Sequence, residues 1–297
     1  MIFTTIREIR HHINEEKKKG RQIGLVPTMG YLHEGHLSLI RQAKERGNYV
    51  VLSIFVNPLQ FGPNEDYARY PRDLKRDEKL ADEAGVDAIF APSVEEMYPE
   101  KSLTYVTVEK LSDTLCGLTR PGHFRGVATV VSKLFHIIEP DEAFFGQKDI
   151  QQVRIIEQMV TDLNFPIKVV RCPIIREEDG LAMSSRNVYL SPAERREAPI
   201  LYKALRRAEK AFLNGEIDGN TLVHLVKEQI EQSPSAKIEY VRLVHLKTLD
   251  EVTKVTDPAI LAVAVRFGTT RLIDNILLEP SQNLHYMHKH EGEHGGA

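Results

Sequence analysis

The pattern of apolar and polar positions divides the chain into two parts. In the first part, short apolar runs alternate with amphipathic stretches, and the run 49–55 (YVVLSIF) is almost continuous, as in a strand covered on both faces. Strands that alternate with helices predict an α/β fold with a doubly wound parallel sheet. We expect helices at 6–19, 34–46, 71–84, 123–138 and 148–164, and strands at 22–26, 49–55, 86–90, 142–145 and 167–171.

The composition shifts after residue 187. We expect charged helices at 192–213 and 219–232, followed by β-like runs at 238–245, 260–267 and 271–278. The sequence therefore predicts a Rossmann-like domain over 1–176 and a small α+β domain over 177–280 that closes over the first as a lid. The remaining polar segment, 281–297, contains four histidines, and we predict that it is a disordered tail.

Charge and cysteine content narrow the class of protein. Lys and Arg number 39 against 42 Asp and Glu, and the net charge of −3 argues against nucleic acid as the main partner. The two cysteines, Cys116 and Cys172, form no CxxC pair, which favours a reducing compartment. The N-terminus has no apolar signal region, and no apolar run is long enough to cross a bilayer. We therefore expect a cytoplasmic protein with no membrane partner.

The residues suited to chemistry follow predicted strands. They lie in 27–36, 57–62, 146–152 and 176–187. In an open parallel sheet, ligands bind beyond the carboxyl ends of the strands. The sequence therefore predicts one site built from several of these loops.

The first of these segments, 29–36, reads MGYLHEGH and opens the second helix. Gly30 and Gly35 allow the backbone to approach a ligand closely, and the helix N-terminus offers free N–H groups to an anion. His33 and His36, three residues apart, share one side of that turn. Two solvated histidines or a zinc site are alternatives, but no third ligand has suitable spacing for zinc. Placement between a strand and its helix favours a nucleotide phosphate site.

A second loop, Met183-Ser184-Ser185-Arg186, lies near the predicted domain boundary. Two hydroxyl groups and a guanidinium can hold phosphate oxygens. Alone, such a run is usually an ordinary loop. Together with the upstream HxGH, it resembles the KMSKS-like loop of the nucleotidylyltransferase and class I aminoacyl-tRNA synthetase superfamily, whose members cleave ATP between the α- and β-phosphates.

Three further segments carry candidate binding groups. Lys148, in the run Gly146-Gln147-Lys148-Asp149, follows a strand and suits a phosphate, and Gln152 lies one turn further on. Asn57 and Gln60 are neutral hydrogen-bonding groups that suit hydroxyl and carboxylate recognition. The turn that holds Arg120, His123 and Arg125 could cover phosphates as a flap or simply cap the following helix, and spacing does not decide between the two.

These segments together resemble the pantothenate synthetase (pantoate–β-alanine ligase) family. The matching stretches are PTMGYLHEGH, FVNPLQF, YPRDL, RPGHFRGVATVVSKLF, FGQKDIQQ and EEDGLAMSSRN. They span 27–187 in order, and several long motifs in order are far more specific than HxGH alone. One departure is Gln147, where many relatives have Glu; it flanks Lys148 and should not disable it.

The resemblance implies a ligase that joins pantoate and β-alanine to make pantothenate for coenzyme A. ATP would be consumed through a pantoyl-adenylate intermediate, with AMP and pyrophosphate as products, Mg²⁺ as cofactor and a homodimer as the assembly. The residues implied for ATP are Met29, Gly30, Tyr31, Leu32, His33, Glu34, Gly35, His36, Gly146, Gln147, Lys148, Asp149, Ile175, Met183, Ser184, Ser185 and Arg186. Those implied for the other substrates are Gln60, Gln152, Asn57, Arg120 and His123, with Asp77 for the metal. We expect His33, His36, Lys148 and Arg186 to be the catalytic groups, with His36 in an acid or an electrostatic role.

Three other classes of protein share parts of this pattern. A nucleotidylyltransferase would stop at a stable nucleotide conjugate. A synthetase-like fragment would act on tRNA, although no basic anticodon-binding domain is evident. A non-catalytic nucleotide sensor would not need both the HxGH turn and the MSSR loop.

Overall fold

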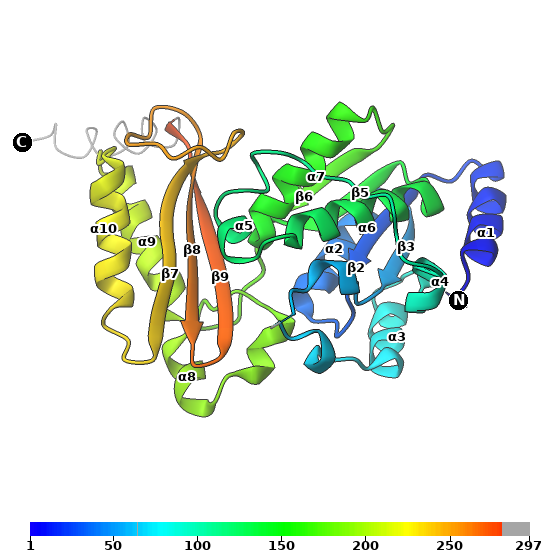
Figure 1. The fold of residues 1–297 in the computed structure, drawn as a ribbon, viewed down its shortest axis with the longest axis horizontal. Helices are drawn as coiled ribbons and strands as arrows, with labels where there is room; N and C mark the ends of the chain where they lie inside the picture. The colour runs from blue at the N-terminus through cyan, green and yellow to red at the C-terminus, as the bar shows by residue number, and fades with distance from the viewer. Residues whose placement is uncertain (64, 281–297) are drawn as a thin grey trace, which may run out of the picture. The chain divides into compact units, whose positions relative to one another are not determined.

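The structure is a computed structural model, and it describes residues 1–63 and 65–280. The chain divides into two compact units, one spanning Met1–Ile175 and the other beginning at Arg176 (Figure 1). The sequence placed the domain boundary one residue later. The predicted disordered tail, 281–297, lies outside the described residues.

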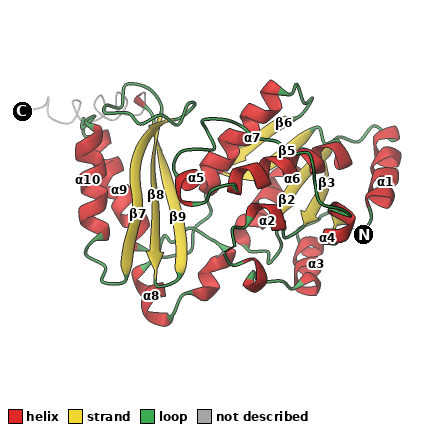
Figure 2. Ribbon diagram, in the orientation of Figure 1, coloured by secondary structure: helices red, strands yellow, loops and turns green. Residues whose placement is uncertain are grey.

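The first unit is built on a six-stranded parallel sheet with the strand order β1-β4-β3-β2-β5-β6. Helices cover both faces of this sheet (Figure 2), so the predicted doubly wound α/β fold is confirmed. The strands are β1 (Ile2–Phe3), β2 (Ile23–Thr28), β3 (Tyr49–Ile54), β4 (Ala88–Phe90), β5 (Glu142–Gly146) and β6 (Lys168–Cys172).

Side-chain alternation along the strands explains the two helical layers. Val26, Val50 and Leu52 are fully buried in a cluster that includes Leu39 and Ile40 of α2. Their neighbours along the strands are buried on the opposite face, because successive strand side chains point to opposite sides. Burying each such side chain contributes roughly 1.5–3 kcal/mol. The helices of this unit are α1 (Ile6–Lys18), α2 (Glu34–Glu45), α3 (Leu74–Glu83), α4 (Val94–Met97), α5 (Cys116–Thr119), α6 (His123–Ile138) and α7 (Ile150–Asp162).

The helix starts depend on caps that the sequence shows. The hydroxyl of Thr5 accepts a hydrogen bond from the backbone N–H of Glu8 (3.2 Å), which is half of a capping box. The Glu8 carboxylate accepts a hydrogen bond from the Thr5 hydroxyl instead of the Thr5 N–H. The structure also contains short elements that were not predicted from the sequence. They are the edge strand β1, helices α4 and α5, and the 3₁₀ turns η1 (Pro58–Gln60), η2 (Tyr67–Arg69) and η3 (Gln147–Asp149).

The topological switch point of the sheet lies between β2 and β5. From β2 the chain moves outward through β3 and β4, and then returns to place β5 on the other side of β2. At such a point two loops diverge from adjacent strand ends and leave a crevice for a ligand. The two loops here lead into α2 and η3, so they carry the HxGH turn and the Lys148 segment.

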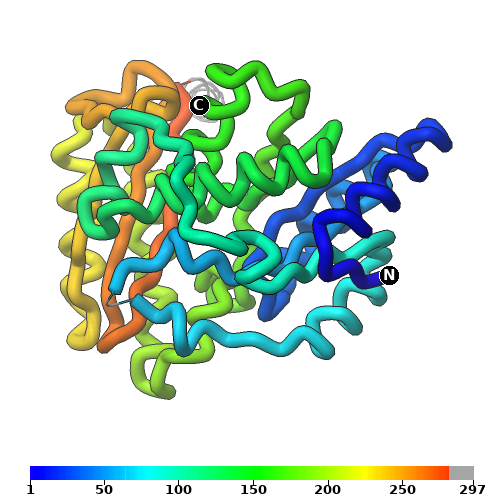
Figure 3. The backbone as a smooth tube through the Cα atoms, turned by 45° about the vertical axis from the view of Figure 1, so that its right-hand side comes forward, coloured from blue at the N-terminus to red at the C-terminus, as the bar shows by residue number. Residues whose placement is uncertain are grey.

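The described residues of the second unit, 176–280, form an antiparallel sheet and three α-helices. Helices α9 (Ile200–Leu213) and α10 (Gly219–Ile230) pack on the sheet of β7 (Ala236–His245), β8 (Ala259–Phe267) and β9 (Thr270–Leu278), as Figures 1 and 3 show. Their apolar stripes form a second core that contains Phe212 and Phe267.

The single helix expected at 192–213 is wrong. The structure has α8 (Pro192–Glu197) and α9, separated at Ala198 and Pro199. Proline has no backbone N–H, so the hydrogen bond that residue 199 would donate to the preceding turn is lost, and a new helix starts there although Ala198 itself keeps helical backbone geometry. In the part of the chain that the structure describes, no helix is both long and apolar enough to span a membrane.

Candidate active site

The HxGH turn begins with two residues in left-handed backbone geometry. Gly30 has φ +82° and Tyr31 has φ +50°. A Cβ atom on Gly30 would lie 2.9 Å from a carboxylate oxygen of Asp77, so glycine is required both for conformation and for space. Asp77, on α3, accepts hydrogen bonds from the N–H groups of Tyr31 (2.6 Å) and Leu32 (2.7 Å). Its buried carboxylate therefore holds the turn that leads into α2.

The sequence assigned Asp77 to the metal, and the geometry favours a positioning role instead. Both of its oxygens accept backbone N–H groups, and its side chain is buried. Burial raises the pKa of Asp77, against the opposing effect of the N–H groups of Leu32 and Tyr31. Over residues 1–63 and 65–280, no group of three or more His, Cys, Asp or Glu side chains could hold a metal ion. These described residues therefore do not form a ready-made Mg²⁺ site.

His33 and His36 form a reciprocal cap at the start of α2. The Nδ1 atom of His33 accepts from the N–H of Gly35 (3.1 Å), and the Nδ1 atom of His36 accepts from the N–H of His33 (3.3 Å). A ring nitrogen that accepts a hydrogen bond carries no proton, so each neutral ring holds its proton on Nε2. The two rings lie with centroids 4.0 Å apart. Both histidines therefore have an Nε2–H donor that the cap itself does not use.

Burial keeps both rings neutral. It lowers the pKa of His33 to about 4, and the charge of Lys148 adds to the effect. Burial also lowers the pKa of His36 well below its usual value, followed by the effects of His33 and Lys148. Lys148 acts on both rings because β2 and β5 are adjacent, which brings η3 beside the start of α2. The structure therefore gathers two neutral donors, one ammonium group and a helix N-terminus at the switch point.

Gln60 is oriented by its neighbours. Its amide oxygen accepts from the side-chain nitrogen of Asn57 (3.2 Å), and its amide nitrogen lies 3.3 Å from the sulfur of Met29. Asn57 is fully buried, and its own amide oxygen accepts from the hydroxyl of Tyr98 (2.9 Å). Tyr98 was not identified from the sequence. Asn57, which the sequence grouped with the substrate ligands, supports Gln60 in this structure.

The close approach of α6 to η1 depends on Gly126. A Cβ atom there would lie 2.2 Å from the carbonyl oxygen of Leu59 and 2.6 Å from the Cα atom of Gln60. The carbonyl oxygen of Gly126 accepts from the side chain of Asn57 (3.1 Å). A backbone contact this close admits no larger residue, so Gly126 sets the position of Gln60 relative to α6.

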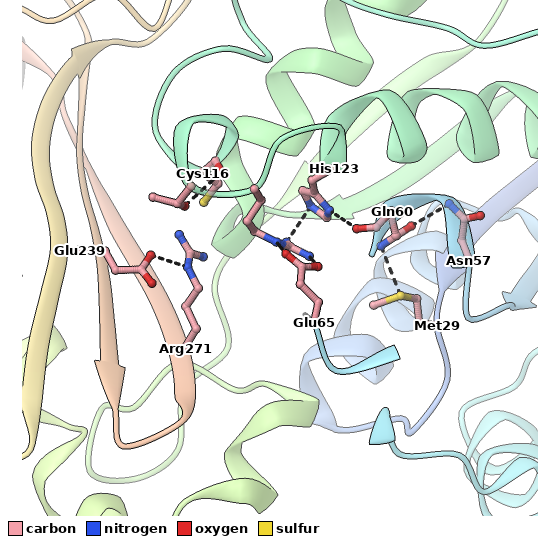
Figure 4. Close-up of polar contacts among 10 residues, drawn as sticks. Met29, Asn57, Gln60, Glu65, Cys116, His123, Glu239 and Arg271 are labelled. Atoms are coloured by element: carbon pink, nitrogen blue, oxygen red, sulfur yellow. Dashed lines mark hydrogen bonds and ion pairs between the residues drawn. The ribbon is translucent and has the colours of Figure 1, made fainter. Parts of the chain in front are cut away.

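A chain of polar contacts connects Gln60 to Arg120 (Figure 4). The Nδ1 atom of His123 lies 2.8 Å from the carbonyl oxygen of Gln60, which can only accept, so Nδ1 carries the proton. The unprotonated Nε2 atom then accepts from Arg120 (2.9 Å). Burial, followed by the charge of Arg120, lowers the pKa of His123 to about 3. Arg120 also donates two hydrogen bonds to the carboxylate of Glu65, each 2.7 Å long.

Gln151 holds the loop that precedes Arg120, and the sequence did not identify this residue either. This buried side chain on α7 accepts from the N–H of Cys116 (2.9 Å) and donates to the carbonyl oxygens of Leu111 (2.9 Å) and Thr114 (2.7 Å). Its neighbour Gln152, the substrate candidate, is half-buried in the first turn of the same helix. The tandem glutamines, at the start of a helix behind a strand, are the only hint of Gln151 in the sequence.

A cavity of about 250 Å³ extends from Met29 and Gly30 toward the ends of β3 and β4. Phe55, Val56 and Ala91 are among its lining residues, so much of its wall is apolar. The cavity lies within the first unit, at the carboxyl ends of the strands, as expected of a ligand site in this fold.

The MSSR loop belongs to the second unit, and a hydrogen bond within the loop stabilises its conformation. The hydroxyl of Ser184 accepts from the N–H of Arg186 (3.2 Å) and caps the 3₁₀ turn Ser185–Tyr189. In the same unit, Arg176 forms a bidentate ion pair with Asp274 (2.6 and 3.0 Å). Figure 4 also shows the Glu239–Arg271 ion pair of this unit (2.7 Å). Ile175 ends the first unit.

The geometry of the first unit defines a class of protein, an α/β fold with a candidate nucleotide site at the switch point of its sheet. A phosphate chain placed there would meet donors from the loops that follow two adjacent strands.

Comparison with known proteins gives the family. The pantoate–β-alanine ligase family model matches residues 1–277. A pantothenate synthetase of Thermoanaerobacter sp. (strain X514) is 59% identical over 278 residues, covering 93% of this chain and 98% of that protein. The crystal structure of pantothenate synthetase from Thermus thermophilus is 48% identical with a TM-score of 0.90, over 94% of this chain and 99% of that chain.

A further solved structure is the pantoate–β-alanine ligase of Francisella tularensis, crystallised with β-γ ATP and β-alanine. It is 35% identical, with a TM-score of 0.77 over 93% of this chain and 97% of that chain. The present chain belongs to the pantoate–β-alanine ligase family, and its reaction is the ATP-dependent condensation of pantoate with β-alanine.

Proposed function

We propose that the reaction proceeds in two steps at the switch point of the sheet. In the first step, a carboxylate oxygen of pantoate attacks the α-phosphorus of ATP, the bond to the β-phosphate oxygen breaks, and pyrophosphate leaves. In the second step, the free amine of β-alanine attacks the acyl carbon of the pantoyl adenylate. The bond to the AMP oxygen breaks, and the amine loses a proton as the amide forms. The pantoate carboxylate is already ionised at neutral pH, so the first step needs no general base.

The observation that carries this proposal is the pair of neutral histidines beside Lys148. Because the pKa of His33 and that of His36 are both lowered, their Nε2–H groups are hydrogen-bond donors and are not sources of a proton at neutral pH. They suit the negative charge that grows on the leaving pyrophosphate. A preorganised donor of this kind is typically worth about 2.7–4 kcal/mol of barrier. The electrostatic role of His36 is therefore favoured over the acid role.

Lys148 and Arg186 would reduce the repulsion between two anions, pantoate and ATP. Ser184, Ser185 and Arg186 offer hydroxyl and guanidinium donors, and Met183 and Ile175 would lie on the nucleotide side. Within the first unit, the ATP ligands of the HxGH turn and of η3 come from adjacent strand ends, which supports one continuous phosphate site. These two segments comprise Met29, Gly30, Tyr31, Leu32, His33, Glu34, Gly35, His36, Gly146, Gln147, Lys148 and Asp149.

Gln60 and Gln152 would hold pantoate. The amide oxygen of Gln60 accepts from Asn57, so its amide nitrogen is the group presented toward Met29, which is itself one of the residues that line the cavity. That nitrogen can donate to a hydroxyl or carboxylate oxygen, while the apolar wall of the cavity suits the two methyl groups of pantoate. Arg120 would bind the second acid, β-alanine, and His123, whose ring nitrogens contact the Gln60 carbonyl oxygen and Arg120, would hold Arg120 in place.

Mg²⁺ would reach the site as part of the nucleotide substrate. Mg²⁺ is commonly held by substrate phosphates and water with few protein carboxylates, which is consistent with the absence of a ready-made cluster among the described residues. A homodimer, a cytoplasmic location and closure of the second unit as a lid are further parts of the proposal, and they rest on the family resemblance and the sequence.

The proposal is tested by incubating the purified protein with ATP, Mg²⁺ and pantoate, with and without β-alanine, and identifying the products by mass spectrometry. We expect pantoate-dependent exchange of labelled pyrophosphate into ATP without β-alanine, and pantothenate plus AMP when it is added. Pantothenate formation without any pantoate-dependent exchange would argue against the adenylate. AMP transfer to another acceptor would move the function to a nucleotidylyltransferase.

A further inference from the structure

Glu65 occupies the position on Arg120 that a substrate carboxylate would need. Its two oxygens accept from Nε and from one terminal nitrogen of the guanidinium, both at 2.7 Å, in the fork geometry that Arg offers to carboxylates. The two side chains are only 15% (Arg120) and 24% (Glu65) exposed. This is a well-formed, largely desolvated pair.

The remaining terminal nitrogen of Arg120 is hydrogen-bonded to a residue that contacts the proposed pantoate site. It donates to His123, which in turn donates to the backbone carbonyl of Gln60. The guanidinium is therefore one imidazole ring away from the residue proposed to hold the first acid. A second acid bound on this guanidinium would lie next to the first.

The two acids of the reaction place different demands on the protein. The pantoate carboxylate is consumed, because it attacks phosphorus and becomes the acyl group. The β-alanine carboxylate takes no part in bond making, so it stays charged throughout and needs a cation. A guanidinium beside the pantoate site is the matching partner.

We propose that Glu65 is an internal carboxylate that competes with β-alanine for Arg120. It fills the carboxylate subsite when β-alanine is absent and must leave before β-alanine binds. Burial alone would raise the pKa of Glu65, but the hydrogen bonds and charge of Arg120 outweigh it and lower that pKa. The competitor therefore remains charged at neutral pH. This inference rests on the proposed role of Arg120 in substrate binding.

Competition of this kind has a defined kinetic effect. The apparent affinity for β-alanine is reduced by the fraction of molecules in which Arg120 is free of Glu65. Replacing Glu65 by a neutral residue removes the competing charge without touching either reacting atom. We expect Glu65→Gln to lower the KM for β-alanine roughly three- to tenfold, with kcat and the KM for pantoate and ATP unchanged.

Glu139→Gln is the matched control. Glu139 pairs with Lys17 just beyond the far end of α6, the 16-residue helix that starts at His123. It is separated from the site by about 24 Å of helix. The control should leave all three KM values at wild-type levels.

The double variant Glu65→Gln with Arg120→Ala completes the test. Arg120→Ala alone should raise the KM for β-alanine, and Glu65→Gln should have no further effect in that background, because Glu65 acts only through Arg120. An increased or unchanged KM for β-alanine in Glu65→Gln would overturn the proposal, the former by showing that Glu65 merely orients Arg120. An equal decrease in both backgrounds would also overturn it.

These outcomes are separable from a failure of the proposed function. Pantoate-dependent pyrophosphate exchange does not involve β-alanine, so it reports on the first step in every variant. Normal exchange with an unchanged KM for β-alanine in Glu65→Gln would reject the competition alone. Absence of any β-alanine product from the wild-type protein would reject both.

Discussion

The side-chain nitrogen of Asn57 donates a hydrogen bond to the amide oxygen of Gln60 at 3.2 Å, and the hydroxyl of Tyr98 donates to the amide oxygen of Asn57 at 2.9 Å. An amide group can be turned over at little cost, so its orientation is set by such partners. This relay leaves the amide nitrogen of Gln60 as the group available to a ligand.

Loss of the Tyr98 hydroxyl should weaken pantoate binding. In Tyr98→Phe, Asn57 loses one partner but keeps its contact with the N–H of Leu59, so the change should be moderate. A net loss of about 1 kcal/mol corresponds to roughly a fivefold higher KM for pantoate, with little effect on the KM for ATP. Steady-state kinetics of the first step measures this split.

Tyr49→Phe is the control for that variant. Its hydroxyl contacts His12 and lies at the opposite end of β3 from the site. An unchanged KM for pantoate in Tyr98→Phe, or an equal rise in both variants, would show that Tyr98 does not position Asn57 and Gln60.

Replacement of Asp77 should affect the HxGH turn. In Asp77→Asn, one oxygen can still accept an N–H group, but the amide nitrogen would face the other N–H. A buried donor left unpaired costs about 1–3 kcal/mol. We expect a lower free energy of unfolding and a higher KM for ATP, with the Mg²⁺ concentration dependence unchanged. Urea denaturation and Mg²⁺ titration of the activity measure these effects.

Asp73→Asn provides the comparison within the same helix. Asp73 is the N-cap of α3, where Asn serves equally well, so stability should be preserved. If Asp77→Asn instead raised the Mg²⁺ requirement at wild-type stability, Asp77 would be a metal ligand as the sequence suggested.

Lys148 should be needed for the first step and dispensable for folding. Its ammonium lies beside His33 and His36, and its side chain is 20% exposed. We expect Lys148→Ala to lower the rate of pyrophosphate exchange by roughly 10²–10³-fold, and His36→Ala to lose most activity as well. Circular dichroism should show that both variants remain folded.

Lys168→Ala is the control for the lost charge. Lys168 begins β6, at the opposite end of the strand from the carboxyl edge of the sheet, and pairs with Glu142 at 3.5 Å. Near-wild-type exchange in Lys148→Ala would exclude Lys148 from the chemistry.

The ionisation of His33 predicts two pH effects. With a pKa of about 4 in the folded chain, the ring stays neutral from pH 8 to below pH 6, so it should cause no change in the exchange rate over that range. The pKa in the unfolded chain is near 6.5. Between these values the unfolded state binds more protons, so the free energy of unfolding must fall as the pH falls from 6.5 toward 4.

The stability effect is measured by urea denaturation at pH 7.5 and pH 5. The wild-type protein should lose up to roughly 2 kcal/mol more than His33→Gln over this interval. NMR of ¹⁵N-labelled histidine should show the Nε2–H tautomer at pH 7. Titration of His33 near pH 6.5 would contradict the neutral-donor assignment.

The sequence by itself determined most of the longer helices and strands and the main motifs, because both depend on local patterns. The apolar run 49–55 is recognisable as a covered strand without tertiary information, and the place of the HxGH turn between a strand and a helix predicts a phosphate site. The break at Pro199 is also local, and the helical periodicity on either side of it led to the wrong expectation of one continuous helix.

Only the tertiary structure decided which groups support the site. Asp77 lies 46 residues from Tyr31, Glu65 lies 55 residues from Arg120, and Tyr98 lies 41 residues from Asn57. No periodicity or spacing relates residues so far apart, because their contacts arise from strand order and from the packing of loops that leave different strands. The role of Asp77 beside the HxGH turn and the pairing of Glu65 with Arg120 are products of the fold.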